Sequence, residues 1–502
     1  MTTHNTSANI TKHNYNAHFD IEFIKKNQIN APRYTSYPTA DKFTNDYTQD
    51  MHMARLYYLK HLNNNTISLY IHIPFCNTLC LYCACNKIIT NDRSNIDTYL
   101  TYLEKEFELY YKFLNKKLDV VQLHFGGGSP SWLDTTQINQ IMNMINKYFN
   151  LANALEIAME IDPRHVDEEF IKTLAYNKFN RISLGVQDFY LTTQKAVNRI
   201  QSYEKTKEIL DYANKYNFKS TNIDLIYGLP YQTLESFSTT INLAIELNVA
   251  RIALFNYAHL PSLFFSQTRI DENSLPDANT KLAILQDSVN KLLKANYVFI
   301  GMDHFAKPDD ELAIATHNNT LHRNFQGYST FANHNMLSFG ASSIGLIGNT
   351  FDNRSYYQNI KDLNSYYALL DNGEFPIYRG IVLNTDDLIR ATIIQNIMCK
   401  FSLNFADIEN IYNINFVNYF NEEIIKLELA HTMEMITLHD NLNGMLDSNL
   451  DITTNKNYMG FNVTDKGRFL IRNIAVIFDA NHKTLLKQQN IPVKNLPYSK
   501  TI

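Results

Sequence analysis

The 502-residue sequence has no long apolar run and no excess of basic residues. A transmembrane helix needs about 20 consecutive apolar residues, but the apolar stretch at residues 469–478 is interrupted by Arg472. The 45 Lys and Arg residues face 50 Asp and Glu, a formal charge of −5. This balance argues against a nucleic-acid-binding protein, because such proteins depend on basic side chains. The first thirty residues are polar, so we expect no secretory signal and a cytoplasmic protein.

The bulk composition excludes several other classes. Hydrophobic residues make up 45% and charged residues 19% of the chain, which is not typical of a disordered, collagen-like or coiled-coil protein. The length is sufficient for a large buried core and predicts roughly three domains.

Cysteine is scarce but unevenly distributed. Only five are present, and four of them, Cys76, Cys80, Cys83 and Cys85, lie within ten residues. A disulfide scaffold would instead spread its cysteines through a short secreted chain. The crowding therefore predicts a metal site in a reducing compartment. The fifth, Cys399, lies in an apolar helical segment, and we interpret it as a buried small hydrophobe.

Four thiols in one short loop leave two kinds of metal site open. A structural zinc site usually pairs two short cysteine motifs across a longer loop, so that its ligands can spread tetrahedrally. Two cysteines only one residue apart make that geometry difficult. The C-x3-C-x2-C spacing of Cys76, Cys80 and Cys83 favours a [4Fe–4S] cluster with three thiolate ligands and one open iron.

Short β-rich runs alternate with longer segments of helical periodicity between about residues 66 and 370. The predicted strands span residues 68–73, 120–125, 155–161, 181–186, 221–227, 251–255 and 298–302, and clear helical segments lie at 95–115 and 135–149. The alternation predicts an α/β fold with a parallel sheet, open or closed into a partial barrel. Chemistry in such folds gathers in the loops at the carboxyl ends of the strands.

We divide the chain into three parts. Residues 1–60 form an N-terminal arm, which we expect to be extended around Pro32 and Pro38 because proline disfavours helix in the residue before it. Residues 61–372 form the partial barrel, and residues 373–502 a mostly helical C-terminal domain. Its predicted helical segments are 385–401, 404–412, 416–427 and 464–478.

Glycine is also rare, at 15 of 502 residues, about half of its typical share of ~7%. Nevertheless, Gly126, Gly127 and Gly128 are consecutive after the second predicted strand. Glycines let the backbone approach a ligand closely, although a flexible turn is the alternative. Glu160 follows the third predicted strand and could accept hydrogen bonds from ribose hydroxyls, a weak signal by itself.

The cysteine loop resembles that of the radical S-adenosylmethionine (radical SAM) enzymes, which have this spacing and an aromatic residue, here Tyr82, before the third cysteine. Over nearly its whole length the chain resembles one family, the oxygen-independent coproporphyrinogen III oxidases. The blocks that carry the resemblance are PRYTSYPT (32–39), HIPFC (72–76), CACNK (83–87), GVQDF (185–189), NIDLIYGLP (222–230), FNYAHL (255–260), GMDHFAKPDDEL (301–312), HRNFQG (322–327) and GRFLIRN (467–473).

The resemblance implies a reaction of haem biosynthesis. A SAM-derived 5′-deoxyadenosyl radical abstracts hydrogen from the β-carbon of a propionate, and the substrate radical loses CO2 and one electron to leave a vinyl group. Two such events turn coproporphyrinogen III into protoporphyrinogen IX. The partners implied are an electron donor such as flavodoxin or ferredoxin and an unidentified electron acceptor. We expect a monomer without a membrane span.

The resemblance also implies roles for individual residues. Cys76, Cys80 and Cys83 would hold the cluster, whose open iron would bind SAM, while Cys85 marks the subfamily. Two SAM molecules would bind. The first would contact Tyr70, Tyr82, Gly127, Glu160 and Ile344. The second would contact Gly128, Ser129, Gln187, Arg199, Asp224 and Ala258.

The implied substrate carries four carboxylates, whereas the chain is net acidic. We therefore expect local basic residues at its site, and arginine is the natural bidentate partner of a carboxylate. The candidates are Arg33 in the arm and Arg323 in the HRNFQG block, and each could equally form a structural salt bridge. Together with Cys85 they are the predicted catalytic residues.

Three positions depart from the family pattern, and they bear on substrate affinity rather than on the reaction class. Ala84 stands where the family usually has Gly, Ser129 where it has Thr, and Ala391 where a second arginine commonly follows Arg390. The alternatives are a haem-binding chaperone of the same superfamily and another radical SAM enzyme acting on a tetrapyrrole. The chaperones typically lack the fourth loop cysteine and the PRYTSYPT block, and both are present here.

Overall fold

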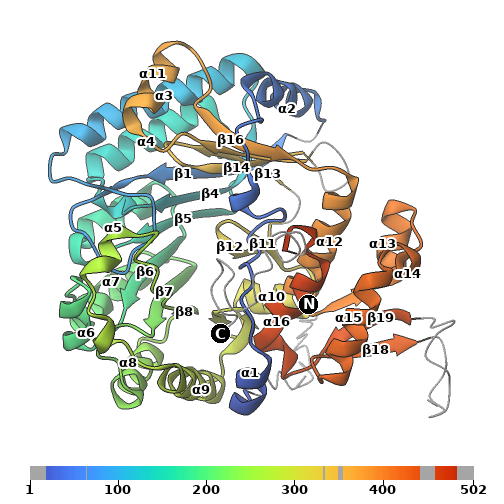
Figure 1. Cartoon of the computed structure of the whole chain (residues 1–502). Helices are drawn as coiled ribbons and strands as arrows, with labels where there is room; N and C mark the ends of the chain where they lie inside the picture. Colours follow the sequence, from blue (N-terminus) through green and yellow to red (C-terminus); the bar gives the residue numbers. More distant parts are fainter. Residues whose placement is uncertain (1–18, 64, 332–333, 349–353, 441–457, 483–502) are drawn as a thin grey trace, which may run out of the picture.

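The computed structural model describes residues 19–63, 65–331, 334–348, 354–440 and 458–482, and one twelve-stranded sheet dominates it. The strands are β1 (Thr66–Ile73), β4 (Asp119–Gly127), β5 (Glu156–Ile161), β6 (Arg181–Gln187), β7 (Ser220–Tyr227), β8 (Arg251–Asn256), β9 (Val298–Gly301), β10 (His304–Ala306), β13 (Asn335–Phe339), β14 (Ile344–Ile347), β15 (Ser355–Asn359) and β16 (Ile377–Val382). They follow the order β16-β15-β14-β13-β1-β4-β5-β6-β7-β8-β10-β9. Among the described residues β16 and β9 do not pair, so the curved sheet stays open (Figure 1), and the predicted partial barrel is confirmed.

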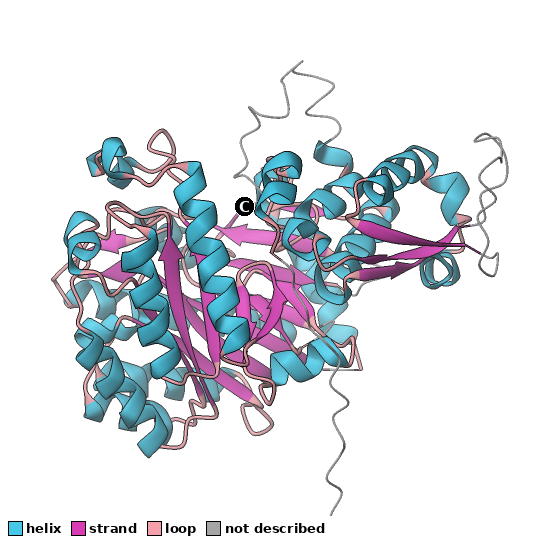
Figure 2. Ribbon diagram, turned by 90° about the horizontal axis from the view of Figure 1, so that it is seen from below, coloured by secondary structure: helices cyan, strands magenta, loops and turns pink. Residues whose placement is uncertain are grey.

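The centre of the sheet is parallel. Strands β1 and β4 to β8 run in the same direction, and β13 is parallel to β1. Helices cover the outer side of the sheet (Figure 2). Among them are α3 (Ser94–Leu114), α4 (Thr135–Tyr148), α8 (Leu234–Glu246) and α9 (Ala278–Lys294), which are labelled in Figure 1. The carboxyl ends of the parallel strands therefore meet at one rim, as the predicted fold requires.

The seven predicted strands correspond to β1 and β4 to β9, with ends that agree within two residues. The sequence pattern did not reveal β13 to β16. The reason is clearest for β15, whose residues Ser-Tyr-Tyr-Gln-Asn are all buried although most of them are polar. Strand β16 belongs to the large sheet although it begins after residue 372, the predicted limit of the barrel.

The N-terminal arm lies across the open side of the sheet. It runs from α1 (Ile21–Asn27) to α2 (Gln49–His61), and residues 31–39 contain no helix, as predicted. The Thr44 N–H donates to the carbonyl of Gly380 in β16 at 2.9 Å, and the Tyr34 hydroxyl donates to Asp479 at 2.9 Å. The arm thus bridges the sheet and the C-terminal part. The predicted polar start, residues 1–18, lies outside the described residues.

The C-terminal part is mostly helical, with a small sheet that was not predicted. Its elements are α12 (Thr385–Lys400), α13 (Phe405–Tyr412), α14 (Phe416–Tyr419), α15 (Asn421–Thr432), α16 (Ile471–Ala475) and the strands β17 (Ser402–Asn404), β18 (Ile436–Asp440) and β19 (Tyr458–Val463). Cys399 in α12 is buried as predicted, with 1% of its surface exposed. Within the described ranges, we find no helix with the length and apolar character that a membrane crossing requires.

Candidate active site

The four clustered cysteines lie in a closed loop directly after β1. The loop begins and ends in two short paired strands, β2 (Phe75–Cys76) and β3 (Ile88–Ile89). The N–H groups of Ile88 and Thr90 donate to the carbonyls of Pro74 and Cys76 at 2.7 and 2.9 Å. Backbone hydrogen bonds therefore hold both ends of the loop and keep its thiols near the rim of the sheet.

The thiols differ in burial and in their neighbours. Cys80 is buried, Cys76 and Cys83 are half-buried, and Cys85 is exposed. Burial and the neighbouring Cys83 and Cys80 thiols raise the pKa of Cys76 to about 12. A hydrogen bond from Cys85 and the nearby Lys87 ammonium lower the pKa of Cys83 to about 6.

Cations lie beside this loop. Arg199 Nη1 is 3.5 Å from the Cys80 sulfur, and Arg164 Nη2 is 3.9 Å from it. Both guanidinium groups also pair with Asp162, at 3.0 and 2.7 Å. Burial alone would raise the pKa of Asp162, but the two arginines lower it to about 2. The loop can therefore carry the negative charge that several thiolates would bring.

The donor chemistry fits an iron–sulfur cluster better than a single ion. Soft thiolates are the ligands that such clusters use, and both Cys83 and Cys80 contribute to the raised pKa of Cys76. In the part of the chain that the structure describes, no three His, Cys, Asp or Glu side chains converge as ligands of one metal ion. The assignment of the three cysteines as cluster ligands stays a prediction.

A first group of predicted SAM contacts meets at the ends of β1, β4 and β5. The Gly127 N–H donates to the Glu160 carboxylate at 3.3 Å, and His124 Nε2 lies 3.4 Å from the same carboxylate. The Tyr70 ring stacks on His124 with centroids 6.0 Å apart. These residues form a polar platform on which Glu160 is held by its neighbours.

The glycine run is required by the close approach of two strand ends. A Cβ on Gly126 would lie 2.8 Å from Glu160 Oε1, and one on Gly127 would lie 2.7 Å from the His72 ring. Gly127 also has a φ of +124°, which L side chains rarely adopt. The predicted role of this run as a close backbone approach is consistent with these contacts.

The other two residues of the first group approach from opposite sides. Tyr82 lies in the cysteine loop, where its carbonyl accepts a hydrogen bond from Gln267 at 3.2 Å. Ile344 begins β14, and its carbonyl accepts from Ser338, the register partner of Tyr70 in β13. The fold therefore brings Ile344 to the β1 side of the platform.

The second group of predicted SAM contacts lies around Arg199. Its Nη2 donates to the Gly185 carbonyl at 2.5 Å, close to Gln187, which has a φ of +71° and a buried Oε1 without a protein partner. Asp224 in β7 accepts hydrogen bonds from Asn222 at 2.8 Å and Ser183 at 3.1 Å. Burial raises the pKa of Asp224 to about 6. An acceptor without a partner at this rim is suited to a ligand.

The remaining members of this group lie at the edges of the same rim. The Gly128 and Ser129 N–H groups donate to the carbonyls of Ile73 and Phe75 at 2.8 and 2.9 Å. Ala258 follows β8, and its carbonyl accepts from Gln267 at 3.3 Å. Most of the predicted SAM contacts therefore lie at strand ends or in the loops beside them. The exceptions are Tyr70 and Asp224, which lie within β1 and β7, and Arg199, which lies between the helices α6 (Leu191–Ala196) and α7 (Tyr203–Lys215). The individual roles of all eleven stay predictions.

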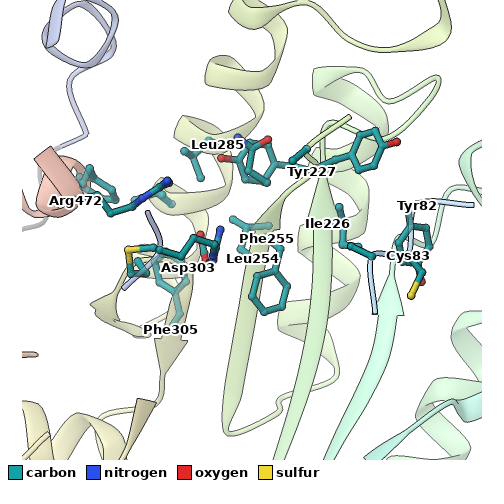
Figure 3. Close-up of a pocket in the computed structure, with 18 of the residues that line it drawn as sticks. Tyr82, Cys83, Ile226, Tyr227, Leu254, Phe255, Leu285, Asp303, Phe305 and Arg472 are labelled. Atoms are coloured by element: carbon teal, nitrogen blue, oxygen red, sulfur yellow. The ribbon is translucent and has the colours of Figure 1, made fainter. Parts of the chain in front are cut away.

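A cavity of about 560 Å³ extends from the cysteine loop toward the arm and the C-terminal part. Cys83 and Tyr82 lie at one end, and Arg472, Asp303 and Phe305 at the other (Figure 3). Its walls between these ends are mainly apolar, with Ile226, Leu254, Phe255, Leu285, Val289, Phe299 and Phe469. A cavity of this size and character is typical of a small-molecule site.

Arginines dominate the end of this cavity that lies away from the cysteines. Arg33 pairs with Asp303, and its guanidinium carbon lies 5.9 Å from the Phe255 ring centroid. Burial, followed by repulsion from Arg472 and Arg323, lowers the pKa of Arg33. Burial also lowers the pKa of Arg472. This mutual repulsion indicates positive charge that an anionic ligand would neutralise.

The predicted residue Arg323 does not line this cavity. It faces a neighbouring cavity of about 500 Å³ together with Tyr34, Arg354 and Ala391. Its guanidinium carbon lies 4.8 Å from the Tyr328 ring centroid, and its Nε and Nη1 are buried without a protein partner. The two predicted arginines thus contribute charge to adjoining compartments, and Arg323 acts on the first only at longer range.

Sequence reasoning missed two residues of the main cavity, Arg472 and Asp303. Both lie in blocks that were recognised, GRFLIRN and GMDHFAKPDDEL. Within those blocks, no spacing distinguishes them from neighbouring charged residues. Of the three departures from the family pattern, exposed Ala84 lines the main cavity, Ser129 contacts Ser131 at 3.2 Å, and buried Ala391 lines the second cavity.

Known proteins resemble this chain over almost its whole length. Residues 70–244 match the model of the Radical SAM superfamily. The oxygen-independent coproporphyrinogen III oxidase of Salmonella typhimurium is 42% identical over 92% of this chain and 95% of its own, and that of Escherichia coli K12 is 41% identical over 94% and 96%. The solved structure of the Escherichia coli protein, described as a radical SAM enzyme, superposes with a TM-score of 0.83 at 40% identity and covers 92% of this chain and 99% of that one.

Proposed function

Because the chain belongs to the family of oxygen-independent coproporphyrinogen III oxidases, we propose that it converts two propionates of coproporphyrinogen III to vinyl groups, giving protoporphyrinogen IX. Each conversion removes one hydrogen atom, one CO2 and one electron from a propionate side chain. The named relatives support this oxidase activity and not the haem-chaperone alternative. The observation that carries the proposal is the single cavity that connects the cysteine loop to Arg33 and Arg472.

The cysteine loop would hold the resident cofactor. Cys76, Cys80 and Cys83 would ligate a [4Fe–4S] cluster with one open iron, and Arg199 beside Cys80 would offset its negative charge. When bound, the cluster and SAM supply the radical chemistry that removes a hydrogen atom from the substrate. Cys85, exposed and in contact with Cys83, would face the substrate.

Two SAM molecules would bind at the rim, one at each group of strand-end residues. Glu160 would accept hydrogen bonds from the ribose of the first, and Gly127 would let its backbone approach closely. Asp224 would accept from the second, whose charged groups Arg199 would meet. The unpartnered Gln187 Oε1 supports a ligand at this second position.

The arginine end of the cavity would orient the substrate. Arg33 and Arg472 would each pair with a carboxylate that does not react, which leaves a propionate near the cysteine end. The apolar walls would exclude water around the reacting carbon and so limit side reactions. The protein's part is therefore to hold charge at one end and a dry space at the other.

Three further features remain expectations from the sequence. We expect electrons from a one-electron donor such as flavodoxin or ferredoxin and an acceptor for the electron that each decarboxylation releases. We also expect a monomer in the cytoplasm. These can be examined by donor titration, by light scattering and by fractionation.

The decisive experiment is an anaerobic assay of the reconstituted protein. The protein would be loaded with iron and sulfide and incubated with SAM, a reductant and coproporphyrinogen III. We expect protoporphyrinogen IX and one CO2 per vinyl group formed. A protein that holds the cluster and cleaves SAM but yields no vinyl product from coproporphyrinogen III would refute the proposal.

Cysteine variants test the site within the same assay. Cys76→Ala should lose both cluster absorbance and turnover. The matched control is Cys399→Ala, the same substitution at a buried cysteine of α12 outside the loop, and it should retain both. Cys85→Ala should keep the cluster absorbance with impaired turnover. A lost cluster in this variant would mean that the ligand set has been chosen wrongly.

A further inference from the structure

A tight turn carries a carboxylate into the main cavity. Strands β9 and β10 are antiparallel with His304 opposite Gly301, so only Met302 and Asp303 connect them. Met302 has a φ of +51°, a conformation that tight hairpin turns usually assign to glycine or asparagine. The Leu254 N–H of β8 donates to the Asp303 carbonyl at 2.7 Å. The strained turn is thus held in place with Asp303 at its tip.

The negative charge of Asp303 should weaken the binding of an anionic ligand in this cavity. Its side chain is 14% exposed and pairs with Arg33. The neighbouring walls are apolar, with Leu254, Phe255 and Phe305 (Figure 3). A buried carboxylate there cancels one of the two positive charges that would attract the substrate's carboxylates. When a substrate carboxylate competes with Asp303 for Arg33, a hydrogen-bond donor on the ligand would offset the loss to Asp303.

The chemistry of the substrate supplies that partner. A porphyrinogen carries carboxylates around its edge and four pyrrole N–H groups that point toward its centre. An ionised carboxylate can only accept hydrogen bonds, so Asp303 is complementary to the N–H groups and repels the edge. We propose that Asp303 accepts hydrogen bonds from the pyrrole N–H groups of the reduced macrocycle while Arg33 binds a carboxylate. This inference rests on the proposed function and names the recognition element of that site.

The proposal predicts selectivity for the reduction state of the ligand. Coproporphyrin III, the oxidised macrocycle, has the same four carboxylates but only two N–H groups and two nitrogens with lone pairs. Asp303 should therefore favour coproporphyrinogen III over coproporphyrin III. A charge-assisted hydrogen bond contributes about a ten- to hundredfold change in affinity.

The test is to measure the dissociation constants of both macrocycles by anaerobic fluorescence titration of the cluster-loaded protein with SAM and no reductant. Asp303→Asn should weaken coproporphyrinogen III roughly ten- to hundredfold and leave coproporphyrin III unchanged or tighter. Arg33→Met should weaken both macrocycles by similar factors because it acts on their shared carboxylates. Asp309→Asn, the same chemical change at an exposed position outside the cavity, should alter neither.

Three outcomes would overturn the inference. Tighter binding of both macrocycles by Asp303→Asn would mean that Asp303 only reduces the local positive charge. Equal weakening of both, as with Arg33→Met, would mean that it only positions Arg33. If Asp303→Asn does not fold, Asp303→Glu, which keeps the charge but displaces the acceptor, should show the selective loss, and its absence would also refute the inference. A wild-type protein that turns over coproporphyrinogen III while showing any of these results would leave the proposed function intact.

Discussion

Arg472 connects the C-terminal part to the N-terminal arm beside the main cavity, and its removal should open the arm. The side chain is 3% exposed. Its Nε donates to the Pro32 carbonyl at 2.9 Å and its Nη2 donates to the Ala31 carbonyl. Each hydrogen bond from a charged donor contributes about 1.5 kcal/mol or more. Arg472→Met should therefore destabilise the docked arm by about 3 kcal/mol, which raises the population of the open arm roughly 100-fold.

Amide hydrogen exchange measures this opening directly. Peptides that cover residues 28–37 should exchange roughly 100-fold faster in Arg472→Met, while peptides from β4 to β7 should be unchanged. The KM for coproporphyrinogen III should rise as well, because a carboxylate partner is lost. The control is Arg251→Met in β8, whose guanidinium group pairs with Asp310 at 2.9 Å within the barrel. Unchanged exchange in Arg472→Met, or an equal rise in the control, would refute the reasoning.

Three further predictions concern buried or strained groups. Burial raises the pKa of Glu106 to about 7, so the folded state favours the protonated carboxyl group. The free energy of unfolding should therefore fall by on the order of 3 kcal/mol as the pH rises from about 4.5 to above 7. Chemical denaturation should find this pH dependence reduced in Glu106→Gln. Gly127→Ala should abolish binding of the first SAM molecule in equilibrium dialysis, because its Cβ would lie 2.7 Å from the His72 ring at a φ of +124°. Normal binding at this first position would contradict the close approach. Asp224→Asn should lower the number of bound SAM molecules from two to one, and an unchanged stoichiometry would contradict the second site. Burial raises the pKa of Asp224 to about 6, so SAM binding at this position of the wild-type protein should weaken below pH 6.

Much of the barrel could be predicted because its central strands bury apolar residues at alternate positions, as in β6 and β7. The flanking strands could not be predicted, since β15 buries tyrosines and side-chain amides whose hydrogen-bond partners, such as Glu106 and Arg379, lie far away in the sequence. The cysteine loop could be predicted because its cysteines are close together in the sequence. The contact between Arg472 and Ala31 spans more than 400 residues, and no local pattern encodes it.

The same reason explains the different fates of the two predicted arginines. Arg33 and Tyr34 are adjacent, yet Arg33 faces the main cavity and Tyr34 faces the second one beside Arg323. Sequence alone indicates that a basic residue is needed but not on which side of the arm it lies. Asp303 was missed for a related reason, because a carboxylate runs against the expectation of a purely basic site.

The contacts between residues 31–34 and residues 472–479, which cover the main cavity, have a consequence for the synthesis of the protein. A ribosome releases the thiol loop and strands β1 to β8 long before Arg472 and Asp479 emerge. The nascent barrel can therefore present its cysteines for iron–sulfur assembly while the compartment is still uncovered. Closure of the main cavity needs residues from the last part of the chain, so the cysteine loop is synthesised before that cavity can be covered.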